Sequence, residues 1–171
     1  MKAMERAVTK RVFDQAKLCQ DPVFEDLQIF EKGRKIMQDV KGKKILYEQD
    51  GVLLGKHLAI IVECKKSSRK ADLLDFANKI VDIQERVKNQ ENSLEAFFGK
   101  KILGVFASDS LGNDEGRSAE IVEEARRNHI VLYTRNGAEY SMVGSEDVGC
   151  NGESSFCNLI TSTLQDSRPS D

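Results

Sequence analysis

The chain has 171 residues, of which 40% are hydrophobic and 32% charged, and this is enough apolar material for the core of one domain. It contains no Trp and only two Pro, which excludes collagen-like and mucin-like polymers. The 26 basic and 28 acidic residues give a net charge of −2, so the chain lacks the overall basic field of a histone-like binder.

No apolar run approaches the roughly 20 residues that span a bilayer, and no charged-then-apolar leader opens the sequence. We therefore expect a cytoplasmic, intracellular protein without a membrane segment. The four cysteines form no C-x-x-C pair and have no His at a zinc-binding interval. Reduced thiols are the expectation in such a compartment, and a Cys150–Cys157 disulfide is the alternative.

The first elements in the chain are predicted to be helices. Apolar residues recur at three- and four-residue intervals in residues 1–20, which indicates an amphipathic N-terminal helix. Asp21-Pro22 is a helix start signal, with Asp as N-cap and Pro at the first helical position, and it predicts a second helix to about Val40.

Two apolar runs then flank Gly55-Lys56, a pair typical of a two-residue hairpin turn. We expect strands over 44–54 and 57–65, a long helix from about Arg69, a strand over 101–108, a further helix around 121–125 and a last strand over 130–134. This order predicts an α/β fold, with a central mixed β-sheet flanked by helices.

The chain divides by composition into an N-terminal helix (1–20), an α/β domain (21–140) and a tail (141–171). The tail is rich in Ser, Gly and acidic residues, so we expect it to be mostly disordered, although residues 156–164 would suit a short docked helix.

One cluster of polar side chains in the hairpin could carry chemistry. If Leu54 faces His57 across the turn, then Glu48, Asp50, Glu63 and Lys65 project from one side of the hairpin. Asp50 and Glu63 are then diagonal neighbours, with Cα atoms roughly 7–8 Å apart. Two carboxylates that close repel each other unless a cation lies between them, and Mg²⁺ or Mn²⁺ is the natural partner of such oxygen ligands.

Asp50, followed thirteen residues later by Glu63-Cys64-Lys65 at the end of an apolar strand, closely resembles the PD-(D/E)XK nuclease superfamily. The likeness covers about residues 21–135 and is nearest to the Mrr-type and archaeal junction-resolvase-like branch. It implies a restriction-endonuclease-like αβββαβ core, here with an extra N-terminal helix and an additional αβ unit. Two departures are Gln49 in place of the Pro before Asp50, and Val87 where some branches carry a Tyr three residues after Gln84.

The resemblance also implies the roles of individual residues. Asp50 and Glu63 would bind Mg²⁺ or Mn²⁺ together with the Cys64 carbonyl, and Lys65 would assist the attacking water. Glu25 would be the acidic residue contributed by the preceding helix, with Glu5, Glu31 and Glu48 as alternatives.

The sequence therefore predicts a metal-dependent nuclease that hydrolyses phosphodiester bonds of nucleic acid, more specifically a DNA endonuclease. Two local basic clusters would contact backbone phosphates, namely Lys41, Lys43, Lys44, Lys66, Arg69 and Lys70. The alternatives are a catalytically silent nucleic-acid-binding or scaffolding subunit on the same fold, and an interaction protein whose first helix packs on a partner; a homodimer is compatible with each. The plainest interpretation of the cluster is a solvated sheet edge with an ordinary Glu–Lys pair.

Overall fold

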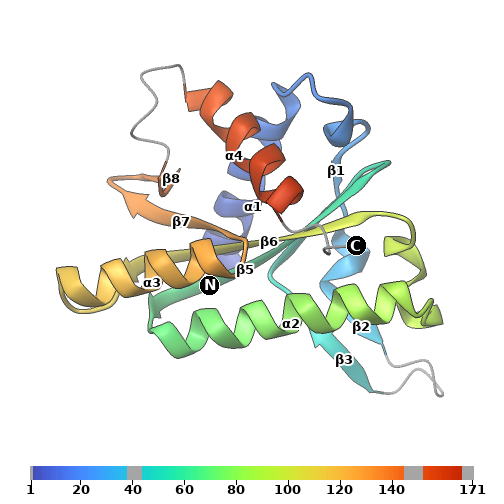
Figure 1. The fold of residues 1–171 in the computed structure, drawn as a ribbon, viewed down its shortest axis with the longest axis horizontal. Helices are drawn as coiled ribbons and strands as arrows, with labels where there is room; N and C mark the ends of the chain where they lie inside the picture. Colours follow the sequence, from blue (N-terminus) through green and yellow to red (C-terminus); the bar gives the residue numbers. More distant parts are fainter. Residues whose placement is uncertain (1, 38–43, 145–151, 167–171) are drawn as a thin grey trace.

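The structure is a computed structural model that describes residues 2–37, 44–144 and 152–166 (Figure 1). The helices are α1 (Lys2–Lys17), α2 (Lys70–Lys88), α3 (Glu115–Arg127) and α4 (Gly152–Asp166), with 3₁₀ turns η1 (Pro22–Phe24), η2 (Glu31–Arg34) and η3 (Asn92–Phe97). The strands are β1 (Gln28–Ile29), β2 (Lys35–Met37), β3 (Ile45–Glu48), β4 (Gly51–Leu54), β5 (Leu58–Ser68), β6 (Lys101–Leu111), β7 (Ile130–Asn136) and β8 (Glu139–Met142).

The main sheet has six strands in the order β1-β4-β5-β6-β7-β8, and β2 and β3 form a separate two-stranded sheet. β5, β6 and β7 run parallel, joined by α2 and α3, whereas β4 and β8 pair antiparallel at either side of them. Parallel neighbours need a crossover, which the two helices supply. The expected α/β class with a mixed sheet is therefore confirmed.

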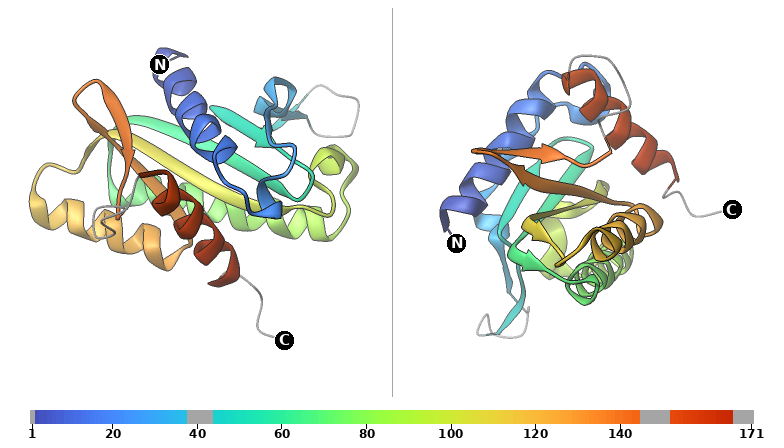
Figure 2. Two further views of the ribbon diagram at one scale, coloured as in Figure 1. Left: turned by 90° about the horizontal axis from the view of Figure 1, so that it is seen from above. Right: turned by 90° about the vertical axis from the view of Figure 1, so that its left-hand side faces the viewer.

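Helices cover both faces of the main sheet: α1 and α4 lie on one side, and α2 and α3 on the other (Figure 2). Side chains of β5 alternate between these layers. Ile60 and Val62 join the α1 layer, while Ala59 and Ile61 join the α2 layer. A strand buried on both faces needs a continuous apolar run, and this explains the sequence of β5 before Glu63.

The elements from residue 69 onward agree with the sequence pattern. Arg69 is the N-cap of α2: its N–H donates to the Asp72 carboxylate at 2.8 Å, and its main-chain carbonyl accepts the Asp72 N–H at 3.1 Å. The predicted strands over 101–108 and 130–134 and the helix around 121–125 are β6, β7 and α3, each slightly longer than expected.

The helix expected over residues 21–40 is wrong as far as the structure describes that segment. Asp21 does cap a helical turn, by accepting from the Val23 N–H, but the turn ends after three residues. Asp26 then takes a positive φ of 59°, which no helix contains, and the chain continues into β1, η2 and β2. Residues 38–43 lie outside the described residues.

The segment 141–171 is more ordered than expected. It contains the end of β8 and all of α4, whose Phe156, Ile160 and Leu164 are buried in the same core cluster as α1. The docked helix that residues 156–164 suggested is therefore present, and it is longer than that window. Both flanking segments, 1–20 and 141–171, contribute to one core with the central part of the chain.

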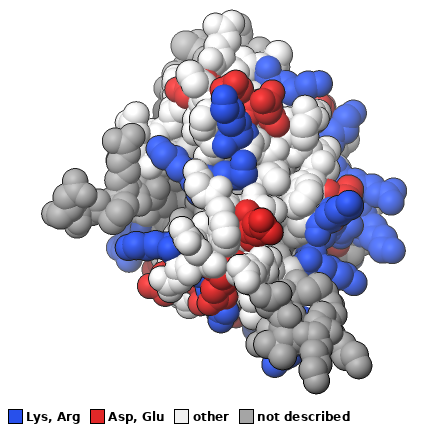
Figure 3. Space-filling view, turned by 90° about the vertical axis from the view of Figure 1, so that its right-hand side faces the viewer, with Lys and Arg blue, Asp and Glu red and all other residues white. Residues whose placement is uncertain are grey.

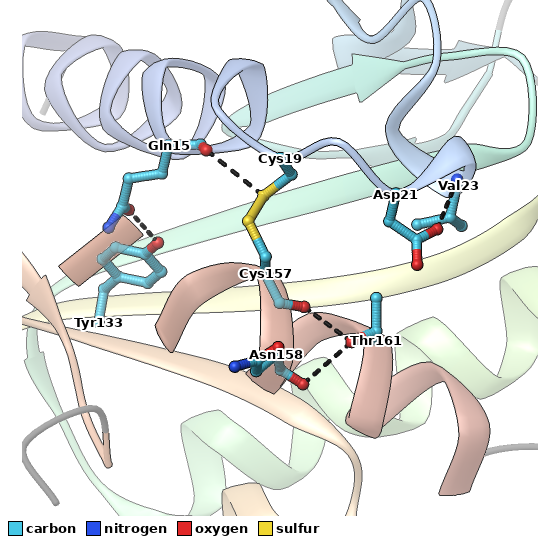
Figure 4. Close-up of a disulfide and its surroundings, with 8 residues drawn as sticks. All are labelled: Gln15, Cys19, Asp21, Val23, Tyr133, Cys157, Asn158 and Thr161. Atoms are coloured by element: carbon cyan, nitrogen blue, oxygen red, sulfur yellow. Dashed lines mark hydrogen bonds between the residues drawn. A yellow bond between two sulfur atoms is a disulfide. The ribbon is translucent and has the colours of Figure 1, made fainter. Parts of the chain in front are cut away.

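A disulfide between Cys19 and Cys157 joins the end of the α1 region to α4 (Figure 4). The expectation of reduced thiols is wrong for these two residues. The alternative pair, Cys150–Cys157, is also wrong, because Cys157 is bonded to Cys19; Cys150 lies outside the described residues. The partners are 138 residues apart, so sequence spacing gave no signal for this pair. Beside the disulfide, the Tyr133 hydroxyl donates to Gln15 Oε1 at 2.5 Å, which ties β7 to α1 (Figure 4).

No helix among the described residues combines the length and apolar character needed to cross a membrane.

Candidate active site

The β4–β5 hairpin has a different register from the one that the two-residue turn predicted. Leu54 pairs with Ala59, so residues 55–58 form the connection, and the Gly55 N–H donates to the Leu58 carbonyl at 2.8 Å. Every partner is displaced by two residues, and because side chains alternate with period two, each strand residue keeps its predicted face.

Asp50 lies directly before β4, at a local irregularity of the hairpin. Its N–H donates to the Val62 carbonyl at 3.1 Å, although Val62 is already the register partner of Gly51. Asp50 and Gly51 therefore both lie opposite Val62, which is the pattern of a β-bulge. A bulge changes the direction of the side chains beside it. The Asp50 carboxylate accepts the Cys64 N–H at 2.7 Å. It thus lies against the edge of β5 at a point that β4, which starts at Gly51, does not cover.

The Cys64 peptide is part of this edge. In a strand, the N–H and C=O of one residue point to the same side, so the Cys64 carbonyl is directed toward the side on which its N–H meets Asp50. The Cys64 thiol is buried, and this burial, followed by the charges of Asp50, Glu5 and Glu63, raises its pKa. The thiol is therefore a packing group, while the main chain of Cys64 faces the site.

Glu63 stands on the α2 side of β5 between two lysines. Lys79 of α2 places its Nζ 3.3 Å from Glu63 Oε2 and 2.6 Å from the Glu48 carbonyl, and Lys65 Nζ lies 3.9 Å from Glu63 Oε1. The side chains of Glu63 and Lys79 are only 20% and 17% exposed, whereas that of Lys65 is 41% exposed. Lys79 is thus the inner cation of the pair and Lys65 the one nearer to solvent.

Despite both lysines, the pKa of Glu63 is raised above its ordinary value. Burial is the largest cause and the charge of Asp50 adds to it, while Lys79 and Lys65 act in the opposite direction. Burial therefore outweighs the two ammonium groups, and the ionised form of Glu63 is disfavoured in this environment.

The sequence did not single out Lys79. It lies on the inner side of α2, three residues after buried Phe76 and four before buried Ile83. The sequence does contain a signal for Lys79, because it interrupts the apolar stripe of the helix. A lysine at such a position is unfavourable unless a buried anion faces it.

Glu25 does not belong to this group of residues. Its carboxylate lies 3.6 Å from Lys56 Nζ and 3.5 Å from His57 Nε2, at the turn of the hairpin and therefore at the opposite end from Asp50. The assignment of Glu25 to the site is wrong because residues 22–24 form only a short turn, which carries Glu25 to the hairpin connection.

Of the alternatives, Glu5 of α1 lies near the site. It is buried, it pairs with Arg34 at 2.7 Å, and it lines the same cavity as Asp50. Glu31 is an exposed residue at the rim of that cavity, and Glu48 contributes its carbonyl to Lys79 rather than its carboxylate.

The close approach of α1 to β4 depends on Gly51. A Cβ at this residue would lie 2.2 Å from Thr9 Oγ1, one helical turn from Glu5. We expect Gly51→Ala to lower the free energy of unfolding by about 1–3 kcal/mol, as overpacking typically does, measured by urea denaturation. Gly116→Ala in α3 is the matched control, since the nearest atom, Asp114 Oδ1, is 3.3 Å away and Ala favours a helix. Equal stability of Gly51→Ala and the parent would contradict this account.

The structure describes only part of the two predicted basic clusters. Lys41 and Lys43 lie outside the described residues and Lys44 is exposed before β3. Lys66 and Arg69 are exposed near the end of β5, and Lys70 forms an ion pair with Glu124 at 3.3 Å. On the face drawn in Figure 3, basic and acidic side chains are interspersed. A nucleic acid would therefore meet local clusters of cations instead of a uniform basic surface.

The donor set suits a hard divalent cation. Asp50 and Glu63 offer carboxylate oxygens and Cys64 a carbonyl oxygen, and Mg²⁺ typically takes one or two carboxylates while water or phosphate fills its remaining positions. Within the described ranges, no three His, Cys, Asp or Glu side chains are grouped so that they would hold a metal by themselves. A metal here would thus depend on backbone, water and substrate oxygens.

Comparisons of the chain with known protein families, with curated proteins and with solved structures found no match.

Proposed function

We propose that the protein is a metal-dependent nuclease of the PD-(D/E)XK type, which hydrolyses phosphodiester bonds of DNA. The observation that carries the proposal is the hydrogen bond from the Cys64 N–H to the Asp50 carboxylate. Beside it lies a half-buried Glu63 that forms ion pairs with Lys65 and Lys79. Two acidic groups, a main-chain carbonyl and an ammonium group thereby lie near one another where β4 begins and β5 continues past it.

The order of elements gives further support. α1 packs on the β4–β5 hairpin, α2 crosses to β6, and α3 crosses to β7. This order is compatible with the αβββαβ arrangement of restriction-endonuclease-like proteins. The helix before the hairpin is α1 itself, so it occupies the place that the sequence assigned to residues 21–40.

The residues divide the chemistry among them. A bound Mg²⁺ or Mn²⁺ would lower the pKa of a coordinated water and neutralise charge on the phosphate. Asp50 and Glu63 hold the cation; Asp50 is itself oriented by the Cys64 N–H and Glu63 by Lys79. Lys65, the more exposed ammonium, orients the attacking water and offsets negative charge that develops on the phosphate.

The test is conversion of supercoiled plasmid to nicked and linear forms with Mg²⁺, compared with the same reaction in EDTA. We expect cleavage by the parent protein and losses of at least about a hundredfold in Glu63→Ala and Lys65→Ala. Glu25→Ala is the matched control, because Glu25 lies at the far end of the hairpin, and it should cleave as the parent does. No cleavage by the parent, or equal cleavage by all variants, would exclude this function.

A catalytically silent nucleic-acid-binding subunit is the second candidate. The observation in its favour is that Lys79 lies within 3.3 Å of the Glu63 carboxylate, so Glu63 and Lys79 can form a purely structural ion pair. Calorimetric titration with Mg²⁺ distinguishes the two functions. A nuclease site binds the ion and loses binding in Glu63→Ala, whereas a silent subunit binds DNA without any effect of Mg²⁺.

A further inference from the structure

A cavity of about 450 Å³ opens beside Asp50, between α1, η2 and the start of β4. Its volume lies within the range of sites that hold small molecules. Because Asp50 is part of its wall, whatever occupies the cavity lies next to the phosphodiester bond that the proposed nuclease would cut. The inference below therefore rests on the proposed function.

Two kinds of surface line this cavity. Phe13, Ile29, Phe30 and Val52 provide apolar walls from three different parts of the chain. Glu5 and Arg34 form an ion pair on the wall, so hydrogen-bond acceptors and donors lie side by side there. An occupant should accordingly have flat apolar faces and an edge with both donors and acceptors, which are the properties of a nucleobase.

The exposed rim carries charges of both signs, with Asp14 and Glu31 beside two basic side chains of α1. Arg6 and Lys10, which follow each other at a four-residue interval along α1, are exposed at the rim. They are placed to contact the phosphates on either side of a base that enters the cavity. Within the cavity, Arg34 is already committed to Glu5, which makes the wall a poor site for a second metal ion or for a free anion.

The interior also contains polar atoms without partners. Among the described residues, Thr9 Oγ1 and Arg34 Nε are buried and make no hydrogen bond, and both residues line the cavity. Buried polar groups are rarely left unpaired in a finished structure. The residues that line the cavity therefore have hydrogen-bonding capacity that the protein itself does not use.

We propose that this cavity takes the base of an unpaired nucleotide next to the scissile phosphate, so that the substrate is nucleic acid with an unstacked base. A base inside a duplex cannot enter such a cavity without leaving its stack, and an unpaired base does so at the lowest cost. The protein should therefore bind a duplex with one unpaired nucleotide, or a single strand, more tightly than a fully paired duplex.

Ile29 and Ile45 allow a matched test, because they are 39% and 42% exposed and only Ile29 lines the cavity. Ile29→Trp fills the cavity from an exposed residue, and Ile45→Trp adds the same ring on β3. Both variants are first checked for the unfolding midpoint of the parent. Binding is then measured in EDTA, which prevents turnover, with a duplex carrying one unpaired 2-aminopurine nucleotide and with its fully paired counterpart.

We expect the parent to prefer the unpaired duplex by about tenfold or more, with a change in 2-aminopurine fluorescence on binding. The preference should be lost in Ile29→Trp and kept in Ile45→Trp. Equal binding of the two duplexes by the parent would overturn the proposal, as would equal behaviour of the two Trp variants. A free nucleoside monophosphate is titrated in parallel; competition at the same concentration as the oligonucleotide would also overturn it, since the cavity would then serve a free nucleotide.

This experiment separates the inference from the proposed function. Preferential binding of the unpaired duplex without any Mg²⁺-dependent cleavage would retain the base-binding cavity and exclude the nuclease. Cleavage of paired and unpaired DNA at equal rates, with equal binding, would retain the nuclease and exclude the cavity as a base site.

Discussion

Glu63→Gln is expected to reduce Mg²⁺-dependent cleavage at least about a hundredfold while leaving the fold at neutral pH as stable as the parent or more stable. The amide keeps the shape of the side chain and removes its charge. Since burial and Asp50 raise the pKa of Glu63, the ionised form is disfavoured in the folded protein. In the proposed nuclease, Glu63 would therefore serve the reaction at a cost in stability.

The dependence on pH follows from the direction of this shift. The folded protein retains the Glu63 proton to a higher pH than the unfolded chain, whose carboxyl has its ordinary pKa of 4.5. The stability linked to that proton is complete below the unfolded pKa and is lost as the pH rises through the folded pKa. Urea denaturation should accordingly show an advantage of Glu63→Gln that grows as the pH is raised from below 4.5 toward neutrality.

Added Mg²⁺ gives an independent measurement. A cation held by Asp50 and Glu63 binds the folded state and should raise the unfolding midpoint of the parent but not that of Glu63→Gln. Glu48→Gln, at an exposed residue of β3, is the control and should change neither cleavage nor the response to Mg²⁺. A less stable Glu63→Gln protein at neutral pH would mean that the Glu63–Lys79 ion pair contributes more than burial costs.

Loss of the Cys19–Cys157 disulfide is expected to lower the free energy of unfolding by about 2–5 kcal/mol. The bond closes a loop across a separation of 138 residues, and a crosslink of that span restricts the unfolded chain strongly. Urea denaturation of the parent with and without reductant measures the effect.

Cys157→Ser should show the same loss and no further response to reductant. Cys64→Ser is not the control for this experiment, because Cys64 is buried and its substitution disturbs the core. The Cys19→Ser variant serves instead, and it should match Cys157→Ser. A parent protein whose stability is unchanged by reductant would contradict the contribution assigned to the bond.

Periodicity predicted the central part of the fold well. α2, β6, α3 and β7 are long and regularly patterned, and each has a single way to bury its apolar residues. The helix from Asp21 to Val40 was predicted wrongly, because Asp21-Pro22 does start a helical turn but this turn ends at Phe24. Asp26, with its positive φ, ends any helix there, and single residues in that conformation leave little trace in a sequence.

The candidate site was predictable only in part. Asp50, Glu63 and Lys65 share a motif, and the two-residue displacement of the register preserved the faces of the strand residues. Asp50 precedes β4 at the bulge, and its contact with the Cys64 N–H could not be read from the strand alternation. Which glutamate of the preceding segments would lie near them depended on how α1 packs: this helix approaches β4 at Gly51 and Thr9, so that Glu5 lines the same cavity as Asp50. Lys79 and the Cys19–Cys157 pair are contacts between distant segments, and no local spacing encodes them.

The position of α1 also has a consequence for how the protein folds. This helix packs on β4 and β5 near the middle of the chain, and on β8 and α4 close to its other end. Burial of its apolar residues Val8, Val12 and Ala16 is therefore complete only after β8 and α4, more than a hundred residues away, have joined β4 and β5 around the helix. Contacts between residues that are far apart in the sequence are slow to form. We therefore expect α1 and α4 to dock late, after the β5–α2–β6 unit has assembled.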